Sequence, residues 1–356
     1  MPVLNTEALI ENRVNAIRAY HSNAGVPRAE LDVSGGIDSA VMLMLLAEAL
    51  GPDNVTAAYS SINSSTESRD RARLVAKAAG VKLLELELGD IFEAIGQEAM
   101  RAFGEAGFDT DEIVTFMEGD ASVDGSLRST LRAPVGRYVN RMSGGGIRHG
   151  TGNECEDRWL RFYQKGGDGE VDTNPLAMLS KGEVYQLANA LNVPKEIIDA
   201  LPTPDLWGVG EGHNDEAELL KLSGVAWTYS RIDVDTGEYV RVGTIERMSR
   251  YLDESFEYTR DLGTLFGFVK EEITMEKALF SYPWEGVMQS EKPNVMKGRQ
   301  KFLDLAKEAG LTPEHVVSAN KWERSTRHKM NPNCPSLGSR QELLDAGIIT
   351  NELPKL

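Results

Sequence analysis

A strand–loop–helix unit near the N-terminus constrains the fold of this chain more than any other feature. The stretch LDVSGGIDSAVMLML, residues 31–45, interrupts an apolar run at Ser34, places two glycines, and then becomes apolar again. The first run predicts a buried strand over 29–33, and the second predicts a helix over 38–50. A strand that passes through a tight polar loop into a helix is typical of α/β proteins.

The neighbouring residues continue this alternation of strands and helices. A helix is predicted over 6–22, a second strand over 55–59, a further helix over 67–79 and a third strand over 81–88. This order predicts an α/β, doubly wound, Rossmann-like fold with a parallel sheet covered by helices. Ligands of such sheets bind at the carboxyl ends of the strands, where the loop at 34–39 lies.

The chemistry of that loop suits a phosphate group. Gly35 and Gly36 allow the backbone to approach a bulky anion, and the following helix start presents free N–H groups. Asp38 would repel a bare phosphate, but it fits if a magnesium ion bridges it to the phosphate oxygens. A simple capped turn would explain the same residues. The spacing matches neither the Walker P-loop nor the Gly-x-Gly-x-x-Gly fingerprint.

Composition limits the partners and the compartment. The formal net charge of −17 over 356 residues repels nucleic-acid phosphates, so no nucleic-acid partner is expected. No apolar run is long enough to span a membrane, and no signal peptide is apparent, so no membrane partner is expected. The two cysteines, Cys155 and Cys334, form no Cys-x-x-Cys pair. A cytoplasmic location is therefore expected, without a structural zinc site.

Two groups of motifs resemble known enzymes. The loop SGGIDS resembles the signature of the PP-loop ATP pyrophosphatases, which cleave ATP between its α and β phosphates and adenylate a carboxylate or carbonyl oxygen. The segment HGTGNECEDRWLRFYQKGGDGEVDTNPLAMLSKGEVYQLA, residues 149–188, resembles the ammonia-dependent NAD synthetases. LPTPDLW followed by NDEAEL resembles the proline–threonine loop and acidic helix start of that family, and STRHKMNP resembles its His-Lys signature.

The resemblance implies a ligase that forms a C–N bond, converting deamido-NAD to NAD with ATP and ammonia. It divides the chain into an NAD synthetase domain over 1–222, an inserted helical and hairpin region over 223–312, and a tail over 313–356 that carries the His-Lys signature and completes the main domain. It also implies a homodimer. No glutaminase domain is recognisable, so direct use of ammonia is expected unless a separate glutaminase supplies it.

The resemblance further implies the residues that bind ATP and the metal. Magnesium would lie between Asp38 and Glu156, the positions that match the family's metal-binding acids. The positions that match its ATP-binding residues are Ser34, Gly35, Gly36, Ile37, Asp38, Ser39, Thr151, Lys181 and Thr203. Ordinary structural explanations exist beside these roles: a first-turn carboxylate for Glu156, an exposed lysine for Lys181 and plain loop geometry for Thr203.

Residues for the amidation step follow from the same resemblance. The expected catalytic set is Asp38, Lys181, Asp168, Thr203, His328 and Lys329. Asp168 would hold ammonium and help to deprotonate it, since ammonia must be neutral to attack. Arg128, Arg132 and Asp172 would contact deamido-NAD or ATP. Turn formation is the alternative explanation for the two aspartates, and an exposed helix face is the alternative for the arginines.

Three departures from the family pattern and several rival functions accompany this interpretation. Gly166 replaces an aromatic residue of the family, Pro134 is expected to interrupt or kink a basic helix over 127–142, and residues 224–310 are longer than in compact members. The main rival is another PP-loop ligase that amidates a different carboxylate. A GMP-synthetase-like amination, a tRNA-thiolating enzyme and a nucleotide sensor without catalysis are less consistent with the motifs.

Overall fold

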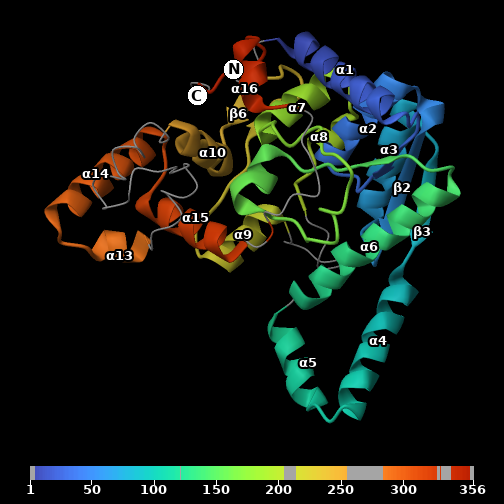
Figure 1. The fold of residues 1–356 in the computed structure, drawn as a ribbon, viewed down its shortest axis with the longest axis horizontal. Helices are drawn as coiled ribbons and strands as arrows, with labels where there is room; N and C mark the ends of the chain where they lie inside the picture. The colour runs from blue at the N-terminus through green and yellow to red at the C-terminus, as the bar shows by residue number, and fades with distance from the viewer. Residues whose placement is uncertain are drawn as a thin grey trace.

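Four parallel strands form one sheet, in the order β3-β2-β1-β4, in the computed structural model of this chain (Figure 1). The structure describes residues 5–120, 122–203, 214–254, 284–326, 329 and 338–352. The strands are β1 Ala29–Asp32, β2 Val55–Ser61, β3 Leu83–Glu87 and β4 Ile147–His149. Leu31 of β1 pairs with Ala57 of β2 on one side and with His149 of β4 on the other. The predicted parallel α/β sheet is confirmed.

Helices and helical turns surround this sheet and extend beyond it. Their bounds are α1 Thr6–Ala24, α2 Ile37–Leu50, η1 Pro52–Asn54, α3 Thr66–Ala79, α4 Gly89–Glu105, α5 Thr110–Gly119, α6 Ser122–Met142, η2 Glu156–Leu160, α7 Lys181–Ala190, α8 Lys195–Ile198, α9 Asp215–Ser223, α10 Thr244–Glu254, α13 Trp284–Gln289, α14 Pro293–Glu308, α15 Pro313–Thr326 and α16 Arg340–Asp345. Figure 1 shows α4 and α5 projecting together away from the rest of the molecule. No helix of the described residues is both long and apolar enough to cross a membrane.

The two faces of β1 carry different chemistry. Ala29 and Leu31 point into the main core, which they share with α1, α2 and α7. Because side chains alternate along a strand, Glu30 and Asp32 lie on the opposite face. There they pair with the guanidinium of Arg148, whose Nη1 lies 2.6 Å from Glu30 Oε2. A Cβ on Gly136 of α6 would lie 1.9 Å from that Nη1, so α6 covers this face closely.

The strand order creates a topological switch point beside β1. After β1, the chain moves outward through β2 and β3, and then returns to place β4 on the other side of β1. The loops that follow β1 and β4 therefore diverge, and a crevice forms between them. The loop 34–39 and the glycine-rich segment after His149 both border this crevice.

Helix α6 differs from its prediction. The sequence predicts an interruption or kink at Pro134 in a helix over 127–142, but α6 runs without a break from Ser122 to Met142 with Pro134 inside it. Pro134 lies on an exposed face, where water can satisfy the carbonyl that loses its intrahelical N–H partner. The expected interruption is therefore wrong.

The region after α9 packs against the main domain. The predicted hairpin is confirmed: β5 Arg231–Ile232 pairs antiparallel with β6 Tyr239–Arg241. Ile232 joins the main core beside α7. A second apolar core holds Trp227, Tyr229 and Phe302 together with Cys155 and Leu160, at the start and end of the segment that contains η2. Both cores thus tie residues after 223 to the domain that carries the sheet.

Candidate active site

A cavity of about 440 Å³ opens at the carboxyl ends of β1 and β4. Its walls come from the loop 34–39, the start of η2, the first residue of α7, the segment 200–203 and the start of α9. The expected functional residues that line it are Ser34, Gly35, Gly36, Ile37, Asp38, Ser39, Arg132, Thr151, Glu156, Asp168, Lys181, Thr203 and Lys329. Residues from distant parts of the chain therefore meet at the switch point that the fold predicts for a ligand.

The loop 34–39 is held by its own hydrogen bonds. The Ser39 hydroxyl donates to the carbonyl of Gly36 over 3.0 Å, and the N–H of Gly36 donates to the Ser34 hydroxyl over 3.2 Å. Gly35 adopts a φ of +82°, and a Cβ there would lie 2.2 Å from the carbonyl oxygen of Ser68. Both observations require glycine at position 35, because an L side chain would meet strain and a backbone clash at once.

The ammonium group of Lys181 joins the two acids expected to bind metal. Its Nζ donates to Asp38 Oδ2 over 2.6 Å and to Glu156 Oε1 over 2.9 Å. The amide of Asn153 donates to the second oxygen of Asp38 over 3.0 Å. One cation, Lys181, and three polar side chains, Asp38, Asn153 and Glu156, therefore join three parts of the chain. These parts are the loop after β1, the segment after β4 and the start of α7.

The electrostatics of this cluster keep the lysine charged. Burial lowers the pKa of Lys181, but the carboxylates of Asp38 and Glu156 outweigh it and hold the pKa well above its usual value. The Nζ also lies 5.0 Å from the ring centroid of Tyr229, which offers a cation–π contact. A buried, charged lysine at the head of α7 gives the cavity a fixed positive group for phosphate oxygens.

The same cluster fits a magnesium ion. Asp38 and Glu156 point oxygens at one common position, where the lysine ammonium now lies. Among the described residues, no three His, Cys, Asp or Glu side chains gather as metal ligands. A cation at this position would therefore take its other ligands from phosphate and water, which is the coordination that magnesium favours.

Asp168 and Lys329 lie on another wall of the cavity. Asp168 Oδ1 accepts from the Ser129 hydroxyl over 2.6 Å and from the backbone N–H of Gln164 over 2.8 Å. The Lys329 ammonium donates to the carbonyl of Arg161 over 3.0 Å. Burial lowers the pKa of Lys329, and the negative charge of Asp168 opposes this shift. Asp168 thus presents a fixed carboxylate at the cavity, near a second cation.

Asp215, at the start of α9, is an unusual member of the wall. The residue is 7% exposed, and its Oδ1 has no hydrogen-bond partner among the described residues. Burial, reinforced by the negative charge of Glu156, raises the pKa of Asp215 to about 8. The sequence indicates only an acidic helix start here, and nothing in its pattern marks the carboxyl group as buried.

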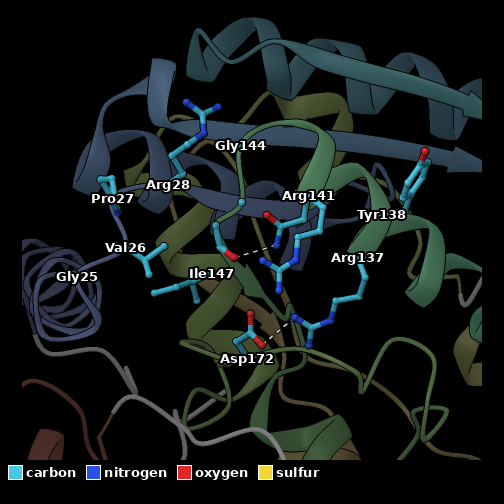
Figure 2. Close-up of a pocket in the computed structure, with 13 residues that line it drawn as sticks. Gly25, Val26, Pro27, Arg28, Arg137, Tyr138, Arg141, Gly144, Ile147 and Asp172 are labelled. Carbon is cyan, nitrogen blue, oxygen red and sulfur yellow. Dashed lines mark hydrogen bonds and ion pairs between the residues drawn. The ribbon is translucent and has the colours of Figure 1, made fainter.

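Three expected residues do not line this cavity. Arg128 is buried and donates to the carbonyl of Ile62 over 2.6 Å, with its guanidinium 5.1 Å from the ring centroid of Phe92. Asp172 lines a separate cavity of about 860 Å³ beside Arg28, Arg137 and Arg141, where Arg137 Nη1 donates to it over 2.8 Å (Figure 2). His328 lies outside the described residues.

Arg71 and Ser129 also line the cavity, although the sequence motifs do not predict either of them there. Arg71 Nε donates to the carbonyl of Gly35 over 3.0 Å and so fixes the loop from α3. Ser129 holds Asp168 through its hydroxyl. The only sequence signal is position: Arg71 lies on the helix that follows the second strand, and Ser129 lies on the same helix as Arg128 and Arg132.

Comparisons with known proteins agree with this geometry. The sequence model of the NAD synthase family matches residues 9–236. The NH(3)-dependent NAD(+) synthetase of Alkaliphilus oremlandii is 33% identical over 60% of this chain and 81% of its own length. That of Archaeoglobus fulgidus is 32% identical over 71% of this chain and 90% of its own. The fold is shared with an NMN synthetase from Francisella tularensis, at a TM-score of 0.56 and 19% identity, over 92% of this chain and 96% of that chain.

Proposed function

This chain belongs to the NAD synthase family, and we propose that it catalyses the ATP-dependent amidation of deamido-NAD by ammonia. The products would be NAD, AMP and pyrophosphate. The observation that carries the proposal is the convergence of Asp38, Glu156 and Lys181 beside the loop 34–39. The two acids and the buried Lys181 lie next to the N-terminal N–H groups of α2. Such a set suits a nucleoside triphosphate and its metal. The curated relatives bear the name of this activity.

In the first step, a carboxylate oxygen of the nicotinate group attacks the α-phosphorus of ATP, and pyrophosphate leaves. The N–H groups of the loop 34–39, the Lys181 ammonium and the Thr203 hydroxyl would stabilise the negative charge that develops on the phosphates. Asp38 and Glu156 would hold magnesium, which supplies positive charge at the phosphate oxygens. Arg132, on the α6 wall, would neutralise a further part of the bound anions.

In the second step, ammonia attacks the acyl carbon of the adenylate. A C–N bond forms, the nitrogen loses a proton to water, the bond from that carbon to the bridging oxygen breaks, and AMP leaves with this oxygen. Asp168 would hold ammonium and accept one of its protons, because only neutral ammonia has the free electron pair. Its carboxylate is already oriented by Ser129 and by the Gln164 backbone.

We also propose a cytoplasmic homodimer, as the resemblance to this family implies. Two cysteines in 356 residues, one of them free and buried at Cys155, are consistent with a reducing compartment. Asp172 and the arginines of the second cavity would then contact the dinucleotide outside the ATP cavity.

A product assay tests the proposed reaction. Purified protein is incubated with ATP, magnesium, ammonium and deamido-NAD, and the nucleotides are separated by chromatography. The proposal predicts NAD and AMP in equal amounts. Since the name of the Francisella protein gives a mononucleotide product, nicotinate mononucleotide is included as a competing carboxylate. Formation of AMP with that carboxylate but not with deamido-NAD would overturn the substrate assignment and keep the adenylation chemistry.

A further inference from the structure

The start of α7, which carries Lys181, is enclosed by residues that follow α9 in the chain. The buried ring of Tyr229 lies against the Lys181 ammonium, with 5.0 Å between Nζ and the ring centroid. A Cβ on Gly182 would lie 1.9 Å from the hydroxyl oxygen of Tyr239, so β6 directly contacts the backbone of the next residue. The region after α9 therefore contacts both Lys181 and the residue that follows it.

The residue before Lys181 is held by the same region. Ser180 is the N-cap of α7: its hydroxyl oxygen accepts from the N–H of Glu183, and its own N–H donates to the Glu183 carboxylate over 2.7 Å. The Ser180 hydroxyl has one proton, and it donates this proton to Glu246 of α10 over 2.6 Å. Ser180 is 0% exposed and Glu246 is 1% exposed, so water cannot replace this acceptor.

Glu246 is itself fixed by groups of the region after α9. Its second carboxylate oxygen accepts from the Ser230 hydroxyl, which in turn accepts from the N–H of Gly243 over 2.9 Å. A Cβ on Gly243 would lie 2.3 Å from the carbonyl oxygen of Thr228, so the residue before α10 is packed closely against the segment that holds Ser230. The acceptor for the Ser180 hydroxyl is therefore held in place by packing and by a second hydrogen bond.

We propose that Glu246 is a positioning residue for Lys181 and acts through Ser180. With its proton given to Glu246, the Ser180 hydroxyl keeps its lone pairs for the N–H of Glu183, which fixes the first turn of α7. A misplacement of about 1 Å at a group that must reach the phosphates can cost about 10²-fold in rate. The inference rests on the proposed role of Lys181 at the phosphates of ATP. It extends that site to residues beyond 236, where the match to the family model ends.

Three variants separate this role from general stability. Glu246→Met fills a similar space without a strong acceptor, so turnover should fall about tenfold while the KM for deamido-NAD stays within about twofold. Glu246→Gln retains an oxygen that can accept from Ser180, so its turnover should stay within about threefold of the parent. Thr228→Val is the control, since the Thr228 hydroxyl accepts from the N–H of Thr244 over 3.0 Å at the start of the same helix. It should lower the urea midpoint and leave turnover within about twofold.

Double variants test whether Glu246 acts through the two residues at the start of α7. Ser180→Ala removes the same hydrogen bond from its other side and should lower turnover about as much as Glu246→Met. Adding Glu246→Met to Ser180→Ala, or to Lys181→Gln, should lower turnover less than about twofold further. An undiminished loss in the Lys181→Gln background would overturn the proposal, because Glu246 would then act independently of the lysine.

ATP binding keeps this test separate from that of the proposed reaction. Titration calorimetry with ATP and magnesium needs no carboxylate substrate, and Glu246→Met is expected to weaken the affinity about fivefold. If the parent forms no NAD, but Glu246→Met and Lys181→Gln both weaken ATP binding, the proposed reaction is wrong and the positioning role stands. If the parent forms NAD, and Glu246→Met equals it in turnover and in ATP affinity, the positioning role is wrong and the reaction stands.

Discussion

The Nζ of Lys181 lies 2.6 Å from Oδ2 of Asp38, the carboxylate to which we assign the metal. With Glu156 at 2.9 Å, the lysine ammonium holds the position that a divalent cation would take between the two acids. A metal bound between these acids would displace the lysine, and the phosphates of ATP would offer the ammonium a new partner. We therefore expect metal and nucleotide to bind cooperatively at this cluster.

Removing the lysine charge separates its two roles. Lys181→Gln leaves Asp38 and Glu156 without a cation, so we expect Mn²⁺ to bind about tenfold more tightly in the absence of ATP. Turnover is expected to fall by about 10²–10³, because a charge aimed at the phosphates is lost. Titration calorimetry measures the metal affinity, with the exposed Lys195→Gln as control. Weaker Mn²⁺ binding in Lys181→Gln would contradict the displacement of the lysine by the metal.

The two adjacent glycines of the loop are expected to differ sharply. Gly35→Ala meets both a φ of +82° and the Ser68 carbonyl, whereas Gly36 has a φ of −87° and only the Ser34 hydroxyl at 3.3 Å. Gly35→Ala should raise the KM for ATP at least about tenfold and destabilise the fold by about 1–3 kcal/mol. Gly36→Ala should change the KM for ATP and the free energy of unfolding much less. Steady-state kinetics and urea unfolding measure the two quantities. Equal effects would show that the close approach of position 35 to Ser68 does not constrain the loop.

Asp168 and Asp172 are expected to act on different substrates, because they line different cavities. Asp168→Asn keeps the shape of the side chain but removes the charge that holds ammonium. Its KM for ammonium should rise at least about tenfold while the KM for deamido-NAD changes little. Asp172→Asn should instead raise the KM for deamido-NAD. Kinetics with each substrate varied in turn distinguish the two, and an unchanged KM for ammonium in Asp168→Asn would remove its proposed role.

A buried histidine pair predicts how stability depends on pH. His21 Nδ1 lies 2.7 Å from the carbonyl of Val26 and must donate to it, so His21 Nε2 accepts from His149 Nε2 at 2.9 Å. Burial, with the neighbouring His21, lowers the pKa of His149 from 6.5 to about 3. Between these pH values the unfolded chain takes up a proton that the folded chain refuses, so the free energy of unfolding falls as pH falls.

His149→Gln tests this linkage, since glutamine keeps an N–H donor without a titrating ring. The loss of stability between pH 6.5 and pH 3 should become shallower than in the parent, whatever the difference in stability at pH 8. Denaturant unfolding at a series of pH values measures both slopes. Identical slopes would show that the pair does not control acid stability.

Local motifs next to strand ends are sufficient to predict most of the cavity. The loop after β1 and Thr151 after β4 come together because parallel strands end at one edge of the sheet, and the start of α7 places Lys181 beside them. Positions that depend on side-chain direction are harder to predict. Arg128 and Arg132 are four residues apart on α6, yet only Arg132 lines the cavity, while Arg128 turns to the carbonyl of Ile62.

Other features depend on tertiary contacts that no local pattern encodes. Arg71 reaches the loop from a helix whose pattern is simply amphipathic, and Asp215 is buried where the charges of Glu156 and Lys181, distant in the chain, act on it. Proline inside a helix is expected to interrupt it, yet α6 continues through Pro134, because this residue is exposed to water. These outcomes follow from packing between distant segments, which local residue patterns do not determine.

The product that receives a carboxylate oxygen of the nicotinate group tests the proposed chemistry most directly. Deamido-NAD is labelled with ¹⁸O in both oxygens of this carboxylate and is converted with ATP, magnesium and ammonium. Mass spectrometry then measures the ¹⁸O content of each product. Attack of the carboxylate on the α-phosphorus predicts one ¹⁸O atom in AMP, one in the amide of NAD and none in pyrophosphate. AMP without the label, alongside NAD formation, would contradict an acyl-adenylate and with it the role we assign to Asp38, Glu156 and Lys181.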